Sequence, residues 1–121
     1  MKKILIVEDE TDIIDIFKVA MDYGPYQLLS ATRGLDALDV TIREVPDLIL
    51  LDIMLPGRID GLEVCYRLKS YDETKGIYII IVSAKGMNTD ILAGLDAGAN
   101  EYIVKPFKIM PLMKKIDQIL E

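Results

Sequence analysis

A short apolar run between two aspartates constrains the fold of this chain more than any other stretch. Residues 48–51 are leucine and isoleucine, with Asp47 before them and Asp52 after them. An unbroken run of this length is typical of a short strand buried on both faces, which is the habit of a parallel sheet. Pro56-Gly57 then forces a loop. Asp52 is therefore predicted at the carboxyl end of the strand, the edge where ligands bind in open α/β sheets.

Further apolar runs alternate along the chain with segments of helical periodicity. Strands are predicted at residues 3–7, 26–30, 47–51, 78–82 and 101–104. Helices are predicted from residue 11 or 12 to Gly24, over 33–43, from Asp60-Gly61 to a turn at 72–76, over 88–98, and from about 107 to 120. Alternation of this kind implies parallel strands joined by right-handed crossovers. The predicted fold is α/β: a three-layer, doubly wound, flavodoxin-like domain with a five-stranded parallel sheet in the order 2-1-3-4-5.

The helical periodicity also predicts which side chains enter the core. The residues assigned to the core on this pattern are Ile13, Ile14, Phe17, Met21, Leu35, Leu38, Ile42, Val64, Leu68 and Leu92. Cys65 is the only cysteine, so no intrachain disulfide is possible. It lies in a helical segment and is expected to behave as a small buried hydrophobe.

Composition and charge exclude several classes of protein. A chain of 121 residues, 51% hydrophobic and 28% charged, is globular and large enough to bury a core as one domain. Its apolar runs are too short for a signal peptide or a membrane-spanning helix, so a cytoplasmic location is expected. The absence of histidine removes serine–histidine and cysteine–histidine catalysis. The net charge of −6 argues against broad nucleic-acid binding.

Polar side chains follow four of the predicted strands. They are Glu8-Asp9 after the first, Asp52 after the third, Ser83 after the fourth and Lys105 after the fifth. In the 2-1-3-4-5 order these groups converge at one edge of the sheet, around the crevice between strands one and three. Carboxylates that lie close together repel one another, so they take up a proton or hold a cation, and an all-oxygen pocket suits Mg²⁺. With a lysine and a hydroxyl beside it, such a pocket suits phosphoryl transfer to Asp52 as the nucleophile.

These motifs resemble, in order and spacing, the receiver domain of two-component response regulators. The resemblance rests on residues 4–10, residues 51–57, Val82-Ser83-Ala84, residues 94–102 and Lys105-Pro106-Phe107. It covers essentially the whole chain, so residues 1–121 are expected to form a single receiver domain. Such a domain is a signalling phosphoacceptor rather than an enzyme, because it promotes only its own phosphorylation and dephosphorylation.

The resemblance implies a magnesium site beside the phosphoacceptor. Asp52 would be the phosphoacceptor and would also contact the metal ion. Asp9 would ligate Mg²⁺ directly, and Glu8 would help to position it. The backbone carbonyl of Met54 would be a further ligand.

The resemblance also implies a switch and two kinds of partner. Ser83 and Lys105 would bind the phosphoryl oxygens, with a cis peptide bond between Lys105 and Pro106. Tyr102 would be the switch aromatic that responds with Ser83. The donor would be the phosphohistidine of a sensor histidine kinase or of a phosphotransfer protein. A downstream effector would be bound through the fourth helix, fifth strand and fifth helix.

Three alternatives remain to be weighed, and the first two come from other classes of protein. A haloacid-dehalogenase-like phosphatase needs Asp-x-Asp after its first strand, whereas this chain has Glu8-Asp9-Glu10. A flavodoxin-like carrier of flavin mononucleotide needs a phosphate-binding loop there, and an acidic loop would repel phosphate. A receiver-like module that is never phosphorylated is the third. One departure from the receiver pattern is the pair Arg58-Ile59, where the family usually has a single residue, so the loop after Asp52 is the least predictable part.

Overall fold

The predicted alternation of strands and helices is confirmed in the computed structural model, which describes residues 1–22 and 24–121. The strands are β1 (Lys2–Val7), β2 (Tyr26–Ala31), β3 (Leu48–Leu51), β4 (Tyr78–Ser83) and β5 (Glu101–Val104). The helices are α1 (Thr11–Met21), α2 (Gly34–Glu44), α3 (Gly61–Ser70), α4 (Asn88–Asp96) and α5 (Ile109–Leu120). The largest differences from the predicted bounds are at helix ends, since α1 ends before Gly24 and α5 begins after residue 107.

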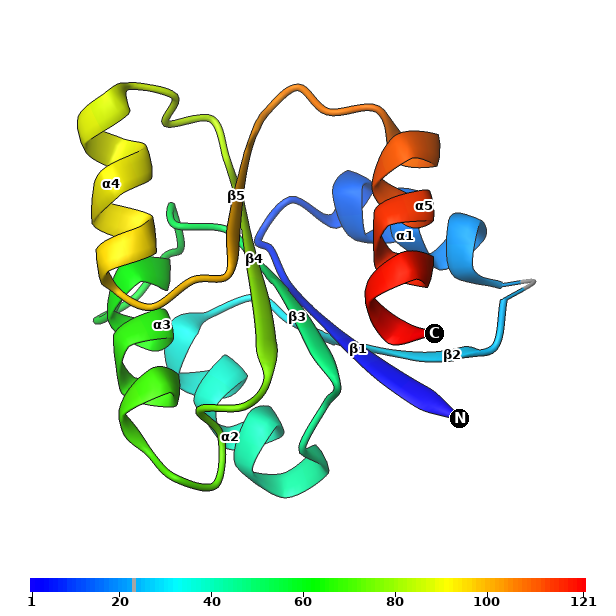
Figure 1. Ribbon diagram of the computed structural model, residues 1–121, viewed down its shortest axis with the longest axis horizontal. Helices are drawn as coiled ribbons and strands as arrows, with labels where there is room; N and C mark the ends of the chain where they lie inside the picture. The colour runs from blue at the N-terminus through cyan, green and yellow to red at the C-terminus, as the bar shows by residue number, and fades with distance from the viewer. Residues whose placement is uncertain (23) are drawn as a thin grey trace.

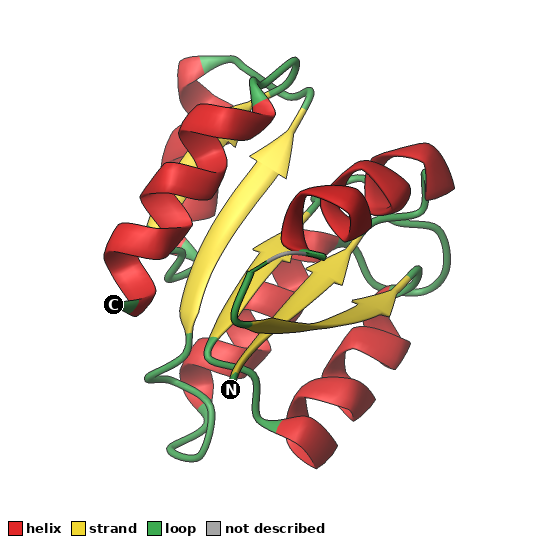
Figure 2. Ribbon diagram, turned by 90° about the vertical axis from the view of Figure 1, so that its right-hand side faces the viewer, coloured by secondary structure: helices red, strands yellow, loops and turns green. Residues whose placement is uncertain are grey.

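The five strands form one parallel sheet in the order β2-β1-β3-β4-β5, as predicted. The strands are labelled in Figure 1, and Figure 2 shows the same sheet from the side with helices on both of its faces. Its register pairs Val7 with Leu51, and Leu51 with Ile81. The residues that follow β1 and β3 therefore leave the sheet side by side. In this way the sheet brings distant parts of the sequence to one edge.

Helices cover both faces of the sheet, with α1 and α5 on one face and α2, α3 and α4 on the other (Figure 1). The strand β3 lies in the middle and is buried on both faces, with no residue more than 2% exposed. Ile49 and Leu51 join the core beneath α2 and α3, while Leu48 and Leu50 join the core beneath α1 and α5. Within the described residues, no helix has the length and apolar character needed to cross a bilayer.

Seven of the ten residues assigned to the core are buried or partly buried, but helix α2 presents a different face from the one predicted. It buries Gly34, Ala37 and Thr41, while Leu35 and Ile42 are 49% and 64% exposed. The buried stripe is made of small residues because α2 lies very close to the loop before α3. A Cβ atom on Gly34 would lie 2.6 Å from the Ile59 side chain. The larger residues one position further along the helix therefore face outward.

Leu92 is a second correction, because its side chain is 59% exposed rather than part of the core. It lies on α4, where Gly94 is the buried residue. Cys65, in contrast, is fully buried as predicted, and burial raises the pKa of its thiol to about 11.

The loop between β3 and α3 holds Asp52 against the start of α3. The Gly61 N–H donates to the Ile53 carbonyl at 2.9 Å, and the Asp60 carboxylate caps the helix by accepting from the Glu63 N–H. A Cβ atom on Gly61 would lie 2.0 Å from the Asp52 carbonyl oxygen, so only glycine fits this approach. In the Arg58-Ile59 pair, Arg58 is exposed and Ile59 is half-buried against the α2 side of the core. The apolar member of the pair thus anchors the loop.

Candidate functional site

Three carboxylates meet at the carboxyl edge of the sheet. Glu8 and Asp9 follow β1, and Asp52 follows β3. One oxygen from each of the three lies within 4.8 Å of the others. Glu8 and Asp52 are buried, at 3% and 5% exposure, whereas Asp9 is exposed. The cluster is therefore accessible to solvent from the side of Asp9.

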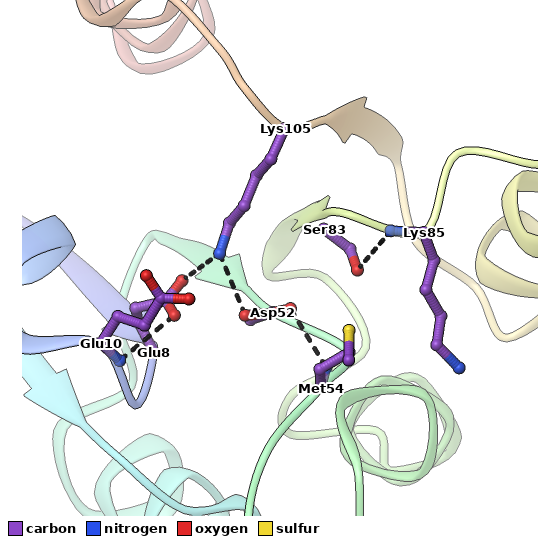
Figure 3. Close-up of polar contacts among 7 residues, drawn as sticks. All are labelled: Glu8, Glu10, Asp52, Met54, Ser83, Lys85 and Lys105. Carbon is purple, nitrogen blue, oxygen red and sulfur yellow. Dashed lines mark hydrogen bonds and ion pairs between the residues drawn. The ribbon is translucent and has the colours of Figure 1, made fainter.

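Lys105, the residue after β5, brings a positive charge into this cluster (Figure 3). Its ammonium donates to Glu8 Oε2 at 2.8 Å and to Asp52 Oδ2 at 3.1 Å. Its backbone N–H donates to the Ser83 carbonyl at 2.8 Å, which ties the end of β5 to the end of β4. The predicted cis peptide bond between Lys105 and Pro106 is present.

The charges in this cluster shift the pKa values of the buried groups. Burial raises the pKa of the Glu8 carboxyl; its hydrogen bond from Lys105 opposes this rise, and the charge of Asp52 adds to it. Burial alone would lower the pKa of Lys105, but its hydrogen bonds to Glu8 and Asp52 outweigh that effect and raise it. The ammonium therefore stays charged between the two carboxylates.

Backbone N–H groups orient two of the carboxylates. The Met54 N–H donates to Asp52 Oδ1 at 3.1 Å, and the Glu10 N–H donates to Glu8 Oε1 at 3.3 Å. Asp52 thus has one oxygen held by a backbone amide and the other by Lys105. The Met54 side chain is 54% exposed at the mouth of the cluster.

Ser83 and Tyr102 are both hydrogen-bonded to the backbone of Lys85. Ser83 is fully buried, and its Oγ accepts from the Lys85 N–H at 3.3 Å. The Tyr102 hydroxyl donates to the Lys85 carbonyl at 2.6 Å. The Lys85 side chain itself points away from Asp52 (Figure 3). The backbone of Lys85, rather than its ammonium, therefore connects the end of β4 to Tyr102.

The donor chemistry of the cluster fits a hard divalent cation. All three carboxylates offer oxygen, the ligand that Mg²⁺ prefers, and Lys105 offsets only part of their negative charge. Glu8, Asp9 and Asp52 are the groups that would hold such an ion. The part predicted for the Met54 carbonyl stays a prediction.

Comparison with known families decides the class of this protein. The profile of the response regulator receiver domain matches residues 4–117. The chain belongs to this receiver family. The fold, the strand order and the acidic cluster are those of the family that the sequence motifs resemble.

Individual relatives agree with this assignment. The response regulator ArlR of Staphylococcus aureus is 42% identical over 99% of the receiver, which spans 53% of that relative's length. The receiver therefore covers about half of the curated proteins that it matches. The BeF3-activated N-terminal receiver domain of Klebsiella pneumoniae RstA superposes with a TM-score of 0.87 at 29% identity, over 99% of both chains. The Mn²⁺-bound form of the response regulator Rcp1 has a TM-score of 0.83 at 26% identity, covering 98% of the receiver and 91% of that chain.

Sequence reasoning missed three features of this receiver site. The Lys85 peptide is one, because any residue type supplies the same backbone groups. Gly61 is another, since an Asp-Gly pair is equally typical of an ordinary turn. The third is Gly94, whose position inside a predicted helix gave no sign of what packs against it. In each of them a neighbouring group contacts the backbone closely, and a pattern of residue types does not predict such a contact.

Proposed function

We propose that this receiver accepts a phosphoryl group onto Asp52 from the phosphohistidine of a sensor histidine kinase or of a phosphotransfer protein. The supporting observation is the environment of Asp52. Its buried carboxylate lies within 4.8 Å of two further acids and is hydrogen-bonded to Lys105. Residues 1–121 would form one receiver domain, acting in the cytoplasm as a signalling phosphoacceptor.

In the proposed step, an Asp52 oxygen attacks phosphorus while the bond from phosphorus to the imidazole nitrogen breaks. An acyl phosphate forms on Asp52, and the electron pair of the broken bond stays with the donor's imidazole, which takes up a proton. The Lys105 ammonium already contacts Asp52 and would bind one phosphoryl oxygen. The Ser83 hydroxyl would donate to another, because its hydrogen bond from the Lys85 N–H does not use the hydroxyl proton.

Mg²⁺ held by Glu8, Asp9, Asp52 and the Met54 carbonyl would supply charge neutralisation for the transferring phosphoryl group. The exposed Asp9 lies on the solvent side of the cluster, where an ion can enter. The charge that the phosphoryl group adds at Asp52 would then act on Ser83 and, through the Lys85 peptide, on Tyr102. The surface of α4, β5 and α5 would present this change to an effector.

The proposal is tested by reaction with a small phosphodonor. We expect the intact mass of the receiver to rise by one phosphoryl group on incubation with acetyl phosphate and Mg²⁺. A matched reaction in which a chelator removes the metal ion should give no rise. A folded receiver that gains no phosphoryl group in Mg²⁺ would instead be an interaction module that is never phosphorylated.

We expect Met54→Asn to speed loss of phosphate from phosphorylated Asp52. The half-exposed thioether of Met54 shields the mouth of the site and offers no strong group to hold an attacking water. An asparagine amide would orient that water. A hydrogen bond worth about 1 kcal/mol corresponds to roughly fivefold in rate. The rate is measured from phosphate release by isolated phosphoprotein in Mg²⁺.

The matched control for Met54→Asn is Met110→Asn, which makes the same chemical change away from Asp52. Met110 is 73% exposed on α5. This control variant should release phosphate at the wild-type rate. Equal rates in the folded Met54 variant and the wild type would show that Met54 does not shield the site.

A further inference from the structure

The ring of Tyr102 packs against the backbone of α4 at Gly94. A Cβ atom built on Gly94 would lie 2.7 Å from Cδ2 and 2.9 Å from Cε2 of the Tyr102 ring, and 2.9 Å from Cδ1 of Ile81. Non-bonded carbon atoms in proteins do not approach this closely. The missing side chain therefore leaves a notch in α4, and an edge of the Tyr102 ring occupies it.

The other end of the Tyr102 side chain is also fixed. Its hydroxyl donates to the Lys85 carbonyl at 2.6 Å, and the N–H of the same Lys85 donates to Ser83 Oγ at 3.3 Å. The ring thus lies between α4 and the loop that follows Ser83. Moving the ring out of the notch would draw the hydroxyl away from Lys85 and remove one of the contacts between that loop and β5.

Glycine is otherwise a poor choice for position 94. It lies in the last turn of α4, which runs from Asn88 to Asp96. Glycine lowers the stability of a helix interior relative to alanine, because the unfolded chain has more freedom to lose. No turn requires it, since Gly94 is not among the residues with a positive φ. The close approach of the Tyr102 ring is the feature that accounts for it.

We propose that Gly94 is a positioning residue for Tyr102. Its notch holds the ring in the conformation that binds the Lys85 carbonyl, and so helps to hold the loop between β4 and α4 against β5. The size of the side chain at position 94 then sets how often the ring occupies this conformation. The link from this conformation to phosphorylation rests on the proposed function, but the packing relation itself does not.

A double-mutant cycle tests the packing relation. The cycle uses the wild type, Gly94→Ala, Tyr102→Ala and the double variant, with urea unfolding followed by circular dichroism. With Tyr102 truncated, Gly94→Ala should change the urea midpoint little, because alanine favours the helix and only the end of the Ile81 side chain still lies near the added Cβ atom. With Tyr102 present, the same substitution should lower it. An equal shift of the midpoint in both backgrounds would overturn the proposal, because contact with Ile81 alone would then explain the glycine.

A second measurement reports the ring position in the folded protein. Gly94→Ala should shift the amide resonances of Lys85 and Ser83, and should change the affinity for beryllofluoride in Mg²⁺ by at least about fivefold. Unchanged amide resonances in the folded variant would overturn the proposal that Gly94 positions the Tyr102 ring. A wild-type receiver that bound no beryllofluoride would overturn the proposed phosphoryl transfer instead, and the stability cycle would still decide the role of Gly94.

Discussion

Replacing Asp52 with asparagine is expected to abolish phosphorylation of this receiver while leaving it folded. Asparagine keeps the volume of the side chain and an oxygen that can accept from the Met54 N–H. It lacks the charged oxygen that would attack phosphorus, and it gives up the ion pair with Lys105. Loss of the nucleophile should slow phosphoryl gain from acetyl phosphate by at least about 100-fold, as measured by intact mass.

The matched control for Asp52→Asn is Asp96→Asn, which makes the same chemical change at an exposed residue at the end of α4. This variant should gain a phosphoryl group as fast as the wild type. Circular dichroism of both variants checks that they are folded. Equal phosphoryl gain by the Asp52 variant and the wild type would remove Asp52 from the proposed role.

Gly61→Ala is expected to destabilise the protein more than substitution at an open site. A Cβ atom there would lie 2.0 Å from the Asp52 carbonyl oxygen and 2.8 Å from the Ile53 Cα atom. Both are backbone atoms of the buried segment after β3, so neither can move as a side-chain tip would. We expect the free energy of unfolding to fall by about 3 kcal/mol, at the upper end of overpacking effects. Urea unfolding followed by circular dichroism measures this loss.

Gly76→Ala is the matched control, since a Cβ atom on Gly76 would meet nothing within 4 Å. It lies in the turn between α3 and β4, and its effect should stay within about 0.5 kcal/mol. If the two alanine variants unfold at the same urea concentration, the close approach of α3 to Asp52 is not a constraint on this fold.

The fold was predictable because local patterns and topology agree in this chain. Unbroken apolar runs such as residues 48–51 indicated buried parallel strands, and the alternation with helices left few possible orders. The error at α2 has a clear cause. Two helical stripes one position apart have the same period, and the larger residues Leu35 and Ile42 favoured the wrong one. Close packing selected Gly34, Ala37 and Thr41 instead, and at Gly34 the neighbouring Ile59 and Val64 leave no room for a Cβ atom.

The convergence of the charged groups was predictable for the same reason. Once the strand order is known, Glu8, Asp52 and Lys105 must leave the same edge of the sheet. The bonds inside the site were not predictable, because they depend on tertiary distances. Lys105 bridges two carboxylates, and a backbone carbonyl of Lys85 receives the Tyr102 hydroxyl. No residue pattern encodes a carbonyl, so the route from Ser83 to Tyr102 appears only in the structure.

The most direct test of the account is to locate the phosphoryl group after reaction with acetyl phosphate and Mg²⁺. Borohydride reduces an acyl phosphate to an alcohol, so the trapped protein should yield a peptide with homoserine in place of Asp52. A parallel sample reacted without the metal ion should yield the unmodified peptide. We expect peptide mass spectrometry to find this change at residue 52 alone. Reduction at another carboxylate, with Asp52 intact, would contradict the central claim.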